Sequence, residues 1–144
     1  IVNVASKTNE KDGLKSQKGD LLIPSSTTTT GIDLANVTAI NKENVFLGGD
    51  ITVLRSKEKT NNVFYAYYLS NYKKEEIASY AQGSTIVHLY YSHIKNMLID
   101  FPSINEQNTV AQFLTSIYTK IETEKNILYK YHSQKRYLLQ NLFI

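Results

Sequence analysis

The sequence predicts an α+β (mixed α/β) globular domain over residues 1–102, followed by one long helix over residues 103–144. In the first half, short apolar runs bounded by glycine, proline or asparagine are typical of strands. Between residues 61 and 80, the apolar residues recur at helical spacing. From residue 110 onward, apolar residues recur at alternating steps of four and three, without proline or glycine. That pattern is typical of a helix that packs against another helix.

The composition excludes several classes of protein. A hydrophobic content of 42% indicates a globular chain, not a disordered one. With no cysteine, a disulfide scaffold and a thiolate zinc site are excluded, and a cytoplasmic location is expected. The sequence shows no signal peptide and no apolar run of membrane-spanning length, so we expect no membrane partner. The net charge of +3 permits nucleic-acid binding if the lysines gather on one face.

The first half of the chain predicts a sheet of short strands. Pro24 ends one apolar run, because proline has no amide hydrogen to donate to a neighbouring strand. Gly48-Gly49-Asp50 predicts a tight turn, so we expect the runs on either side of it in one sheet. The expected strands are Ile1–Val4, Leu21–Ile23, Val37–Ile40, Val45–Leu47 and Ile51–Leu54.

A helical insertion follows the strands. Asn61 or Asn62 can cap a helix whose pattern continues to Tyr80, with Ile77 facing inward. The polar stretch after Tyr80 ends this helix. Further along, the sequence predicts a short turn or helical turn over Ser92–Lys95 and a final strand over Met97–Pro102.

The long helix begins where Ser103 or Asn105 can cap it, with Glu106 in the first turn, where a carboxylate is favourable. At 1.5 Å per residue it would be about 55–60 Å long, too long to be buried by its own domain. We therefore expect it to pair with another helix. We call the pairing residues the apolar ladder; its two charged members, Glu124 and Lys135, are candidates for setting the register. The ladder comprises Val110, Leu114, Ile117, Ile121, Glu124, Leu128, Tyr131, Lys135, Leu138 and Leu142.

Signals for catalysis or metal binding are weak. His88 and His93 are five residues apart, which is neither the spacing of a helical metal pair nor that of one strand face. No base neighbours the hydroxyl residues of Ser25–Thr30, and no phosphate-binding loop is present. We therefore expect no catalytic residue, no metal and no cofactor.

Two polar stretches are better candidates for DNA contact. Gln82–Tyr91 combines an amide, glycine, hydroxyls and aromatics, which can pair with adenine, bond phosphates or stack. Ser25–Thr30 offers hydroxyls, and its threonine methyls can contact thymine. Both stretches could equally be ordinary exposed loops, with Tyr90 and Tyr91 in the core. The predicted DNA-binding residues are Lys15, Lys18, Ser25, Ser26, Thr27, Thr28, Thr29, Thr30, Lys57, Gln82, Gly83, Ser84, Thr85, His88, Tyr90, Tyr91 and Lys95.

From about Lys18 to its end, the chain resembles a type I restriction–modification specificity subunit, more narrowly one target-recognition domain with its spacer helix. The specific parts are the Gly-Ser-Thr loop and the Pro-Ser-Ile-Asn-Glu-Gln start of the helix. The residues that carry the resemblance are Gly19–Ile23 with the Ser/Thr loop after it, Ala81–Thr85, Ile99–Gln107, Val110–Leu114 and Lys135–Phe143.

The resemblance implies a non-catalytic subunit that binds double-stranded DNA. Such a subunit usually has two recognition domains, each followed by a helix, and the two helices pair antiparallel. Each domain reads one half of a split target. The subunit docks adenine methyltransferase subunits, and restriction subunits join indirectly. This chain has one domain and one helix, and we expect its domain to be clipped before Ile1. We therefore expect its helix to pair with a second recognition half or a second copy.

One alternative from another class stays open. The chain could be a coiled-coil scaffold whose head binds a protein or peptide. The surface distinguishes the two hypotheses, because evenly scattered lysines and polar loops on opposite faces would count against DNA binding.

Overall fold

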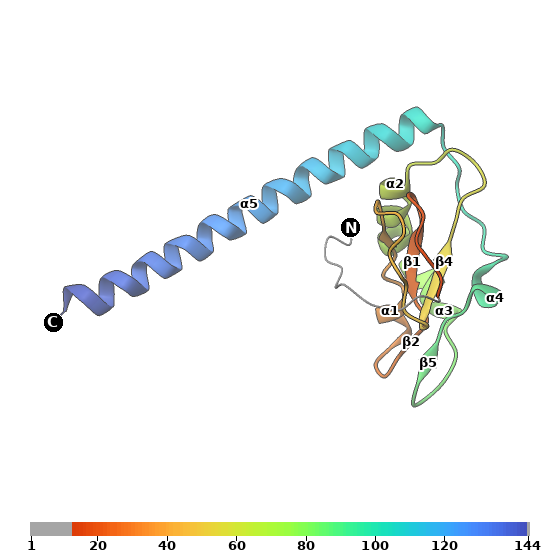
Figure 1. The fold of residues 1–144 in the computed structure, drawn as a ribbon, viewed down its shortest axis with the longest axis horizontal. Coiled ribbons are helices and arrows are strands. Elements are labelled where there is room, and N and C mark those ends of the chain that lie inside the picture. The colour runs from red at the N-terminus through yellow and green to blue at the C-terminus, as the bar shows by residue number, and fades with distance from the viewer. Residues whose placement is uncertain (1–12, 144) are drawn as a thin grey trace. The chain divides into compact units, whose positions relative to one another are not determined.

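The computed structural model describes residues 13–143, so the strand predicted for Ile1–Val4 lies outside the described residues. The chain divides into two compact units, Ile1–Asn108 and Thr109–Ile144. The first is a mixed α+β domain with small antiparallel sheets, and the second consists of the greater part of a long C-terminal helix (Figure 1). The predicted fold class is therefore confirmed.

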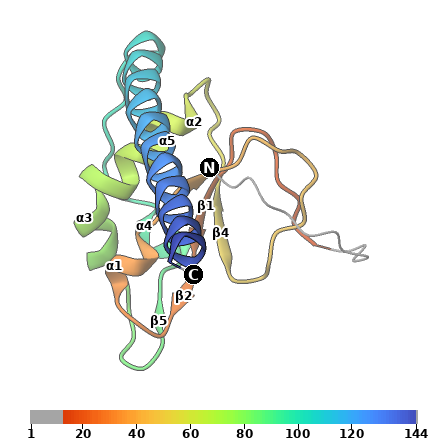
Figure 2. The same cartoon turned by 90° about the vertical axis from the view of Figure 1, so that its left-hand side faces the viewer.

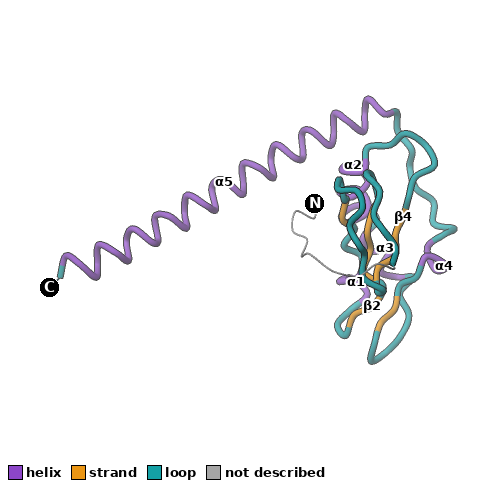
Figure 3. Tube along the Cα trace, viewed as in Figure 1, coloured by secondary structure: helices purple, strands orange, loops and turns teal. Residues whose placement is uncertain are grey.

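The main sheet of the first unit has three antiparallel strands in the order β3-β1-β4. They are β1 (Leu21–Pro24), β3 (Thr38–Ala39) and β4 (Ile51–Leu54). The central strand buries Leu22 and Ile23, as its apolar run predicts. Three expected strands are thereby confirmed, although each is short and much of the unit is loop (Figure 3).

The strand predicted over Val45–Leu47 is wrong. Only Phe46 pairs, in an isolated bridge with Lys15. Backbone hydrogen bonds run instead from the Ser16 amide to the Val45 carbonyl, 2.9 Å, and from the Leu47 amide to the Leu14 carbonyl, 2.9 Å. The segment therefore pairs with residues 14–16 and does not join β4 across the glycine turn.

The predicted helical insertion exists but is broken into three parts, which lie on one side of the main sheet (Figure 2). They are α2 (Asn62–Tyr67), the π-helical turn η1 (Tyr68–Tyr72) and α3 (Lys74–Ser79). The Asn61 side chain accepts a hydrogen bond from the Phe64 amide at 3.0 Å, which confirms Asn61 as the cap. Ile77 is fully buried, as expected.

A short helix, α1 (Gly31–Leu34), was not predicted. It packs against α3 so closely that a Cβ at Gly31 would lie 2.8 Å from the Ala78 carbonyl oxygen. The hydrophobic core lies between the main sheet and these helices. Its buried members are Ile23, Leu34, Ala35, Val37, Leu69, Ile77, Leu89 and Ile94.

The strand predicted over Met97–Pro102 is also wrong. After α4 (Tyr91–Ile94), which confirms the expected helical turn, this segment is extended without strand pairing. The Tyr68 hydroxyl donates to the Asp100 carboxylate at 2.6 Å, and the Asp100 amide donates back at 3.2 Å. The Tyr65 hydroxyl donates to the Asp100 carbonyl at 3.2 Å. Tyrosine side chains thus take the backbone groups that a strand would use.

The long helix is α5 (Ile104–Leu142), 39 residues without a break. Ser103 caps it: the Ser103 amide donates to the Glu106 carboxylate at 2.9 Å, and the Glu106 amide donates to the Ser103 hydroxyl at 3.4 Å. Gln107, in the first unit, is fully buried. Its side-chain oxygen accepts a hydrogen bond from the Asn61 amide at 2.8 Å, and its side-chain nitrogen donates one to the Pro102 carbonyl at 2.8 Å. Across residues 13–143, no helix has the length and apolarity that a bilayer crossing requires.

Candidate nucleic-acid interface

The two polar stretches singled out in the sequence lie side by side. A second sheet joins β2 (Ser26–Thr27) to β5 (Val87–His88), with Ser26 opposite His88 and Thr27 opposite Val87 (Figure 1). The Leu89 amide also donates to the Ser25 carbonyl at 2.9 Å. We call these two stretches, Ser25–Thr30 and Gln82–Tyr91, the paired loops. They form one surface although they are far apart in the sequence.

Within the second stretch, the chain folds back on itself. The Gln82 amide donates to the His88 carbonyl at 2.9 Å, and the His88 amide donates to the Gln82 carbonyl at 2.7 Å. His88 is therefore bonded by Gln82 on one side and paired with Ser26 on the other. This arrangement closes a tight loop over residues 83–87.

Gly83 is required by the geometry of this loop. Its φ is +124°, and a Cβ there would lie 2.0 Å from the Ile86 carbonyl oxygen. No side chain fits at that distance. Gly83, which was predicted to contact DNA, therefore has a conformational role in shaping the loop.

The loop presents unused polar groups at its base and at its tip. Gln82, Ser84 and Thr85 are exposed, and their side chains make no hydrogen bond to another described residue. Such groups are free to donate to, or accept from, a base edge or a phosphate. Thr28, in the other loop, is also exposed, and its hydroxyl makes no hydrogen bond to another described residue.

The remaining hydroxyl residues of the first stretch have internal roles. Ser25 is buried, and its hydroxyl lies 2.8 Å from that of Thr52. Ser26 donates to the Asp50 carboxylate. At the start of α1, the hydroxyls of Thr29 and Thr30 donate to Asp33 at 2.6 and 2.9 Å.

These hydroxyl bonds fix the shape of the threonine loop. The bond from Thr29 is the main reason that the pKa of the Asp33 carboxyl lies below its usual value, with a further contribution from Thr30. Asp33 and Asp50 were not among the predicted site residues. An acidic residue three positions after a Thr, typical of a capping box, was the available signal for Asp33.

An aromatic cluster follows β5. The Tyr90 ring stacks on His88 at 5.5 Å between centroids, and its hydroxyl lies 3.0 Å from the His88 Nδ1. His93 packs edge-on against Tyr90 at 5.4 Å. Leu89, which lies between His88 and Tyr90 in the sequence, is fully buried and anchors the cluster on the core. Tyr90 and Tyr91 are both exposed, so the expectation that they could be core residues is not what the structure shows.

The four predicted phosphate-binding lysines are spread over several parts of the first unit. Because β1 and β4 pair with Leu21 opposite Leu54, Lys18 and Lys57 lie beyond that end of the strands, whereas β2 follows the other end. Lys15 lies over the Phe46 ring at 4.8 Å from its centroid, and Lys95 follows α4. All four are exposed. Lys18 and Lys57 therefore lie away from the paired loops.

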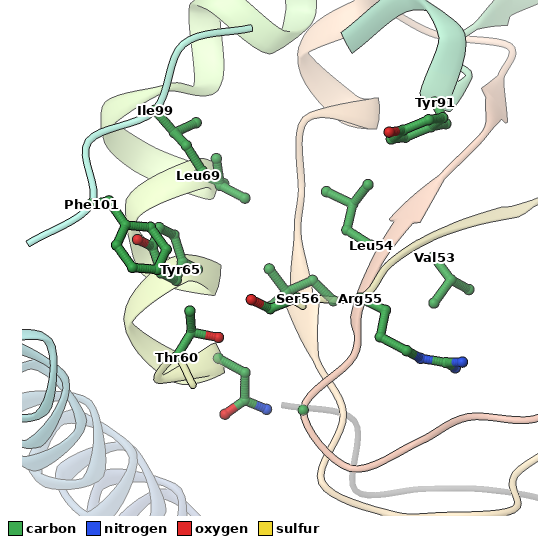
Figure 4. A pocket seen from close by; sticks show the side chains of 13 residues that line it. Val53, Leu54, Arg55, Ser56, Thr60, Tyr65, Leu69, Tyr91, Ile99 and Phe101 are labelled. Carbon is green, nitrogen blue, oxygen red and sulfur yellow. The ribbon is translucent and has the colours of Figure 1, made fainter. Parts of the chain in front are cut away.

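A cavity of about 420 Å³ opens beside β4 (Figure 4). Its lining is mainly apolar and aromatic, with Tyr91 from α4 on one side and Tyr65 from α2 on another. Arg55 at the cavity is bonded through Nε and Nη2 to the two carboxylate oxygens of Asp20, at 2.7 and 2.8 Å. The Asp20 side chain is fully buried, and the Arg55 bond holds its pKa below the usual value although burial acts in the opposite direction.

The described residues hold no group of three or more His, Cys, Asp or Glu side chains that could bind a metal ion.

In the second unit, the apolar ladder lies open. Its apolar members are exposed, apart from the half-buried Leu114. A shallow, mainly apolar groove of about 440 Å³ runs along it, between Ile117 and Leu128.

Comparison with known families gives one match. The family model for the type I restriction modification DNA specificity domain matches residues 1–130, which include the whole first unit and about the first two thirds of α5.

Proposed function

The chain belongs to the family of type I restriction modification DNA specificity domains, and from this premise we propose that it reads one half of a split DNA target. The family consists of non-catalytic DNA-recognition domains that work within restriction–modification complexes. In the proposal, the first unit supplies the base contacts. The helix connects that unit to a second recognition half and to methyltransferase subunits.

The observation that carries the proposal is the pairing of β2 with β5. It brings the segment that carries Gln82, Ser84 and Thr85 beside the segment that carries Thr28, and the polar groups of all four side chains are free. Base edges in the major groove are read by such amides and hydroxyls, and threonine methyls contact thymine. Because the two polar stretches pair instead of lying on opposite faces, and because the matched family is one of DNA specificity domains, we prefer DNA recognition to a peptide-binding scaffold.

Within the proposed surface, residues have different tasks. Gln82, Ser84, Thr85 and Thr28 read bases, whereas Tyr90 bonds a phosphate or stacks. Ser25, Ser26, Thr29 and Thr30 hold the loops in shape. Lys15, Lys18, Lys57 and Lys95 bind phosphates on either side of the target, since phosphate contacts set orientation without carrying sequence information.

The helix has the second task. Its exposed apolar ladder pairs with another such helix, and its outer side is offered to a methyltransferase subunit. Burying a Leu or Ile side chain contributes about 1.5–3 kcal/mol, so the ladder supplies ample stabilisation for a partner helix. A restriction subunit joins through the methyltransferase.

Reconstitution tests the proposal. The chain is co-expressed with the methyltransferase subunit of the same system, the complex is purified, and DNA exposed to it is sequenced for methylated adenines. We expect a stable complex and methylation at one split sequence motif. Methylation without any sequence motif, or a chain that never co-purifies with the methyltransferase subunit, would contradict the proposal.

A further inference from the structure

The charged members of the apolar ladder distinguish between possible partners for α5. Glu124 and Lys135 interrupt an otherwise apolar line, and both are exposed. Neither forms an ion pair with another described residue; the helix's own ion pair joins Lys125 to Glu122 at 2.8 Å. A partner helix that covers the ladder must therefore accommodate one negative and one positive charge, or bury each against apolar groups at a cost.

A second copy of α5 meets this requirement in one antiparallel register. When Glu124 of one copy faces Lys135 of the second copy, every other facing pair is apolar. Because the arrangement is two-fold symmetric, the reverse pair forms as well, giving two opposite-charge contacts per dimer. The apolar facing pairs are Leu128 with Tyr131, Ile121 with Leu138 and Ile117 with Leu142.

The ladder has the spacing that this register requires. In an antiparallel coiled coil, each a position of one helix faces a d position of its partner. The ladder steps of three run from an a to a d position, and all four facing pairs join an a to a d position. Residues beside the ladder also match. Tyr118 and Leu139, both exposed in the single chain, come together across the flank of the pair.

Neighbouring registers fail on charge. A shift of seven residues one way places Glu124 against Leu128 and Lys135 against Ile117. The opposite shift places Glu124 against Leu142 and Lys135 against Tyr131. A parallel pair in register sets Glu124 against Glu124 and Lys135 against Lys135, which is repulsive. One register alone among these satisfies both charges.

We propose that Glu124 and Lys135 make α5 self-complementary, so that it pairs with a second copy of this chain about a two-fold axis between Tyr129 and Lys130. The inference rests on the proposed function only in that the helix pairs. It adds the identity of the partner and the register. The groove between Ile117 and Leu128 then receives residues 131–142 of the second copy.

The register also sets a distance. Asn108, where the first unit ends, lies about 32 Å along the helix from the two-fold axis at 1.5 Å per residue. The two attachment points of the recognition domains are therefore about 65 Å apart along the helix pair. In this arrangement the spacing between the two halves of the DNA target follows from the charge pair.

Charge reversal tests the proposal on the full chain. Glu124→Lys alone and Lys135→Glu alone each turn two attractive contacts into repulsive ones, so self-association in analytical ultracentrifugation should weaken by at least about tenfold. A mixture of the two single variants should restore association, and so should the double variant Glu124→Lys/Lys135→Glu with itself. Because both residues are exposed in the single chain, helix content by circular dichroism should stay unchanged.

A disulfide experiment reads the register directly, since the natural chain has no cysteine. A copy with Leu128→Cys and a copy with Tyr131→Cys should crosslink to each other faster than either does to itself. Equal crosslinking in all combinations, self-association unaffected by either charge reversal, or a strict monomer at tens of micromolar would overturn the proposal. Sequence-specific DNA binding by the same preparations is measured in parallel, so a failed register is distinguishable from a failed DNA-recognition function.

Discussion

At the scale of single residues, the polar side chains of the paired loops divide into two groups. Ser25, Thr29 and Thr30 use their hydroxyls within the protein, with Thr52 or Asp33 as partners. Gln82, Ser84 and Thr85 keep theirs free. The first group gives the loops their shape, and the second gives them a surface that can be read by a ligand. Composition alone gives both groups the same appearance, so their roles could not be told apart in the sequence.

Gly83→Ala tests the loop shape. A Cβ 2.0 Å from the Ile86 carbonyl oxygen, at a φ of +124°, forces the loop open and displaces its tip. We expect DNA affinity to fall by about tenfold or more, measured by fluorescence anisotropy on a target duplex, with little change in the urea unfolding midpoint.

Gly48→Ala is the matched control for that variant. A Cβ at Gly48 meets nothing within 4 Å, so this substitution should leave DNA affinity unchanged. Equal affinities for the two variants and the natural protein would show that the tip of the Gln82–His88 loop does not contact DNA.

Arg55→Ala tests the bidentate pair at the cavity. The substitution leaves the buried Asp20 carboxylate without its main partner, so we expect the urea unfolding midpoint to fall. Arg55 lowers the Asp20 pKa, so in the natural protein its contribution is present above the unfolded-state pKa and is lost as pH falls through the folded-state pKa.

Urea unfolding at pH 7 and at pH values below 4 measures this effect. The free-energy difference between the natural protein and Arg55→Ala should be largest at pH 7 and shrink in acid, where Asp20 becomes protonated. A difference that does not change with pH would show that the pair contributes through packing alone.

At the scale of elements, short sequence signals correctly predicted the helices and strands that depend on neighbouring residues. Apolar runs located β1 and β4, a side-chain cap located the start of α2, and the Ser103–Glu106 box located the start of α5. The segments Val45–Leu47 and Met97–Pro102 have the same apolar character as true strands. Contacts with residues distant in the sequence decided their structure, and no local pattern reports such contacts.

Two further element-scale differences have physical causes. The helix predicted to continue from Asn61 to Tyr80 contains the π-helical turn Tyr68–Tyr72, in which Tyr68 stacks on Phe64 and Tyr72 at 5.8 and 5.4 Å. A π-helical turn adds about one residue to a helical turn, and the spacing of apolar residues does not reveal this addition. The short α1 was hidden because its four residues are too few to show a period.

Gln107→Ala tests how α5 starts. The buried side chain satisfies the Asn61 amide and the Pro102 carbonyl, and its loss leaves both unpaired. We expect the free energy of unfolding to fall by about 1–3 kcal/mol, measured with urea. Gln112→Ala, an exposed glutamine of the same helix, is the control and should change stability by less than about 0.5 kcal/mol. Equal effects would show that Gln107 is not an anchor.

At the scale of the whole molecule, the chain combines a recognition unit with a helix whose apolar ladder is exposed. The sequence was sufficient to select both polar stretches and the ladder as candidate surfaces. It could not show that residues 26–27 and 87–88 are paired, because that pairing joins segments about 60 positions apart. It also suggested a common face for the lysines and the loops, whereas Lys18 and Lys57 lie at the opposite end of β1 and β4 from β2.

Salt dependence tests the proposed lysine contacts. If Lys15, Lys18, Lys57 and Lys95 each bind one phosphate, the logarithm of affinity should fall with the logarithm of salt at a slope of about −3.6. Affinity then drops about a hundredfold between about 50 and 200 mM salt. Lys57→Ala should weaken binding to all sequences alike and make the slope shallower by about one unit. A flat response to salt would contradict phosphate binding by these residues.

Whether the paired loops read DNA sequence can be measured from the methylation that the complex directs. Methylated adenines are mapped by sequencing after reaction with complexes that contain the natural chain, Gln82→Ala, Thr85→Val or Lys57→Ala. We expect a changed or relaxed methylation motif for the Gln82 and Thr85 variants, and an unchanged motif with lower activity for the Lys57 variant. An identical motif from all four complexes would contradict the claim.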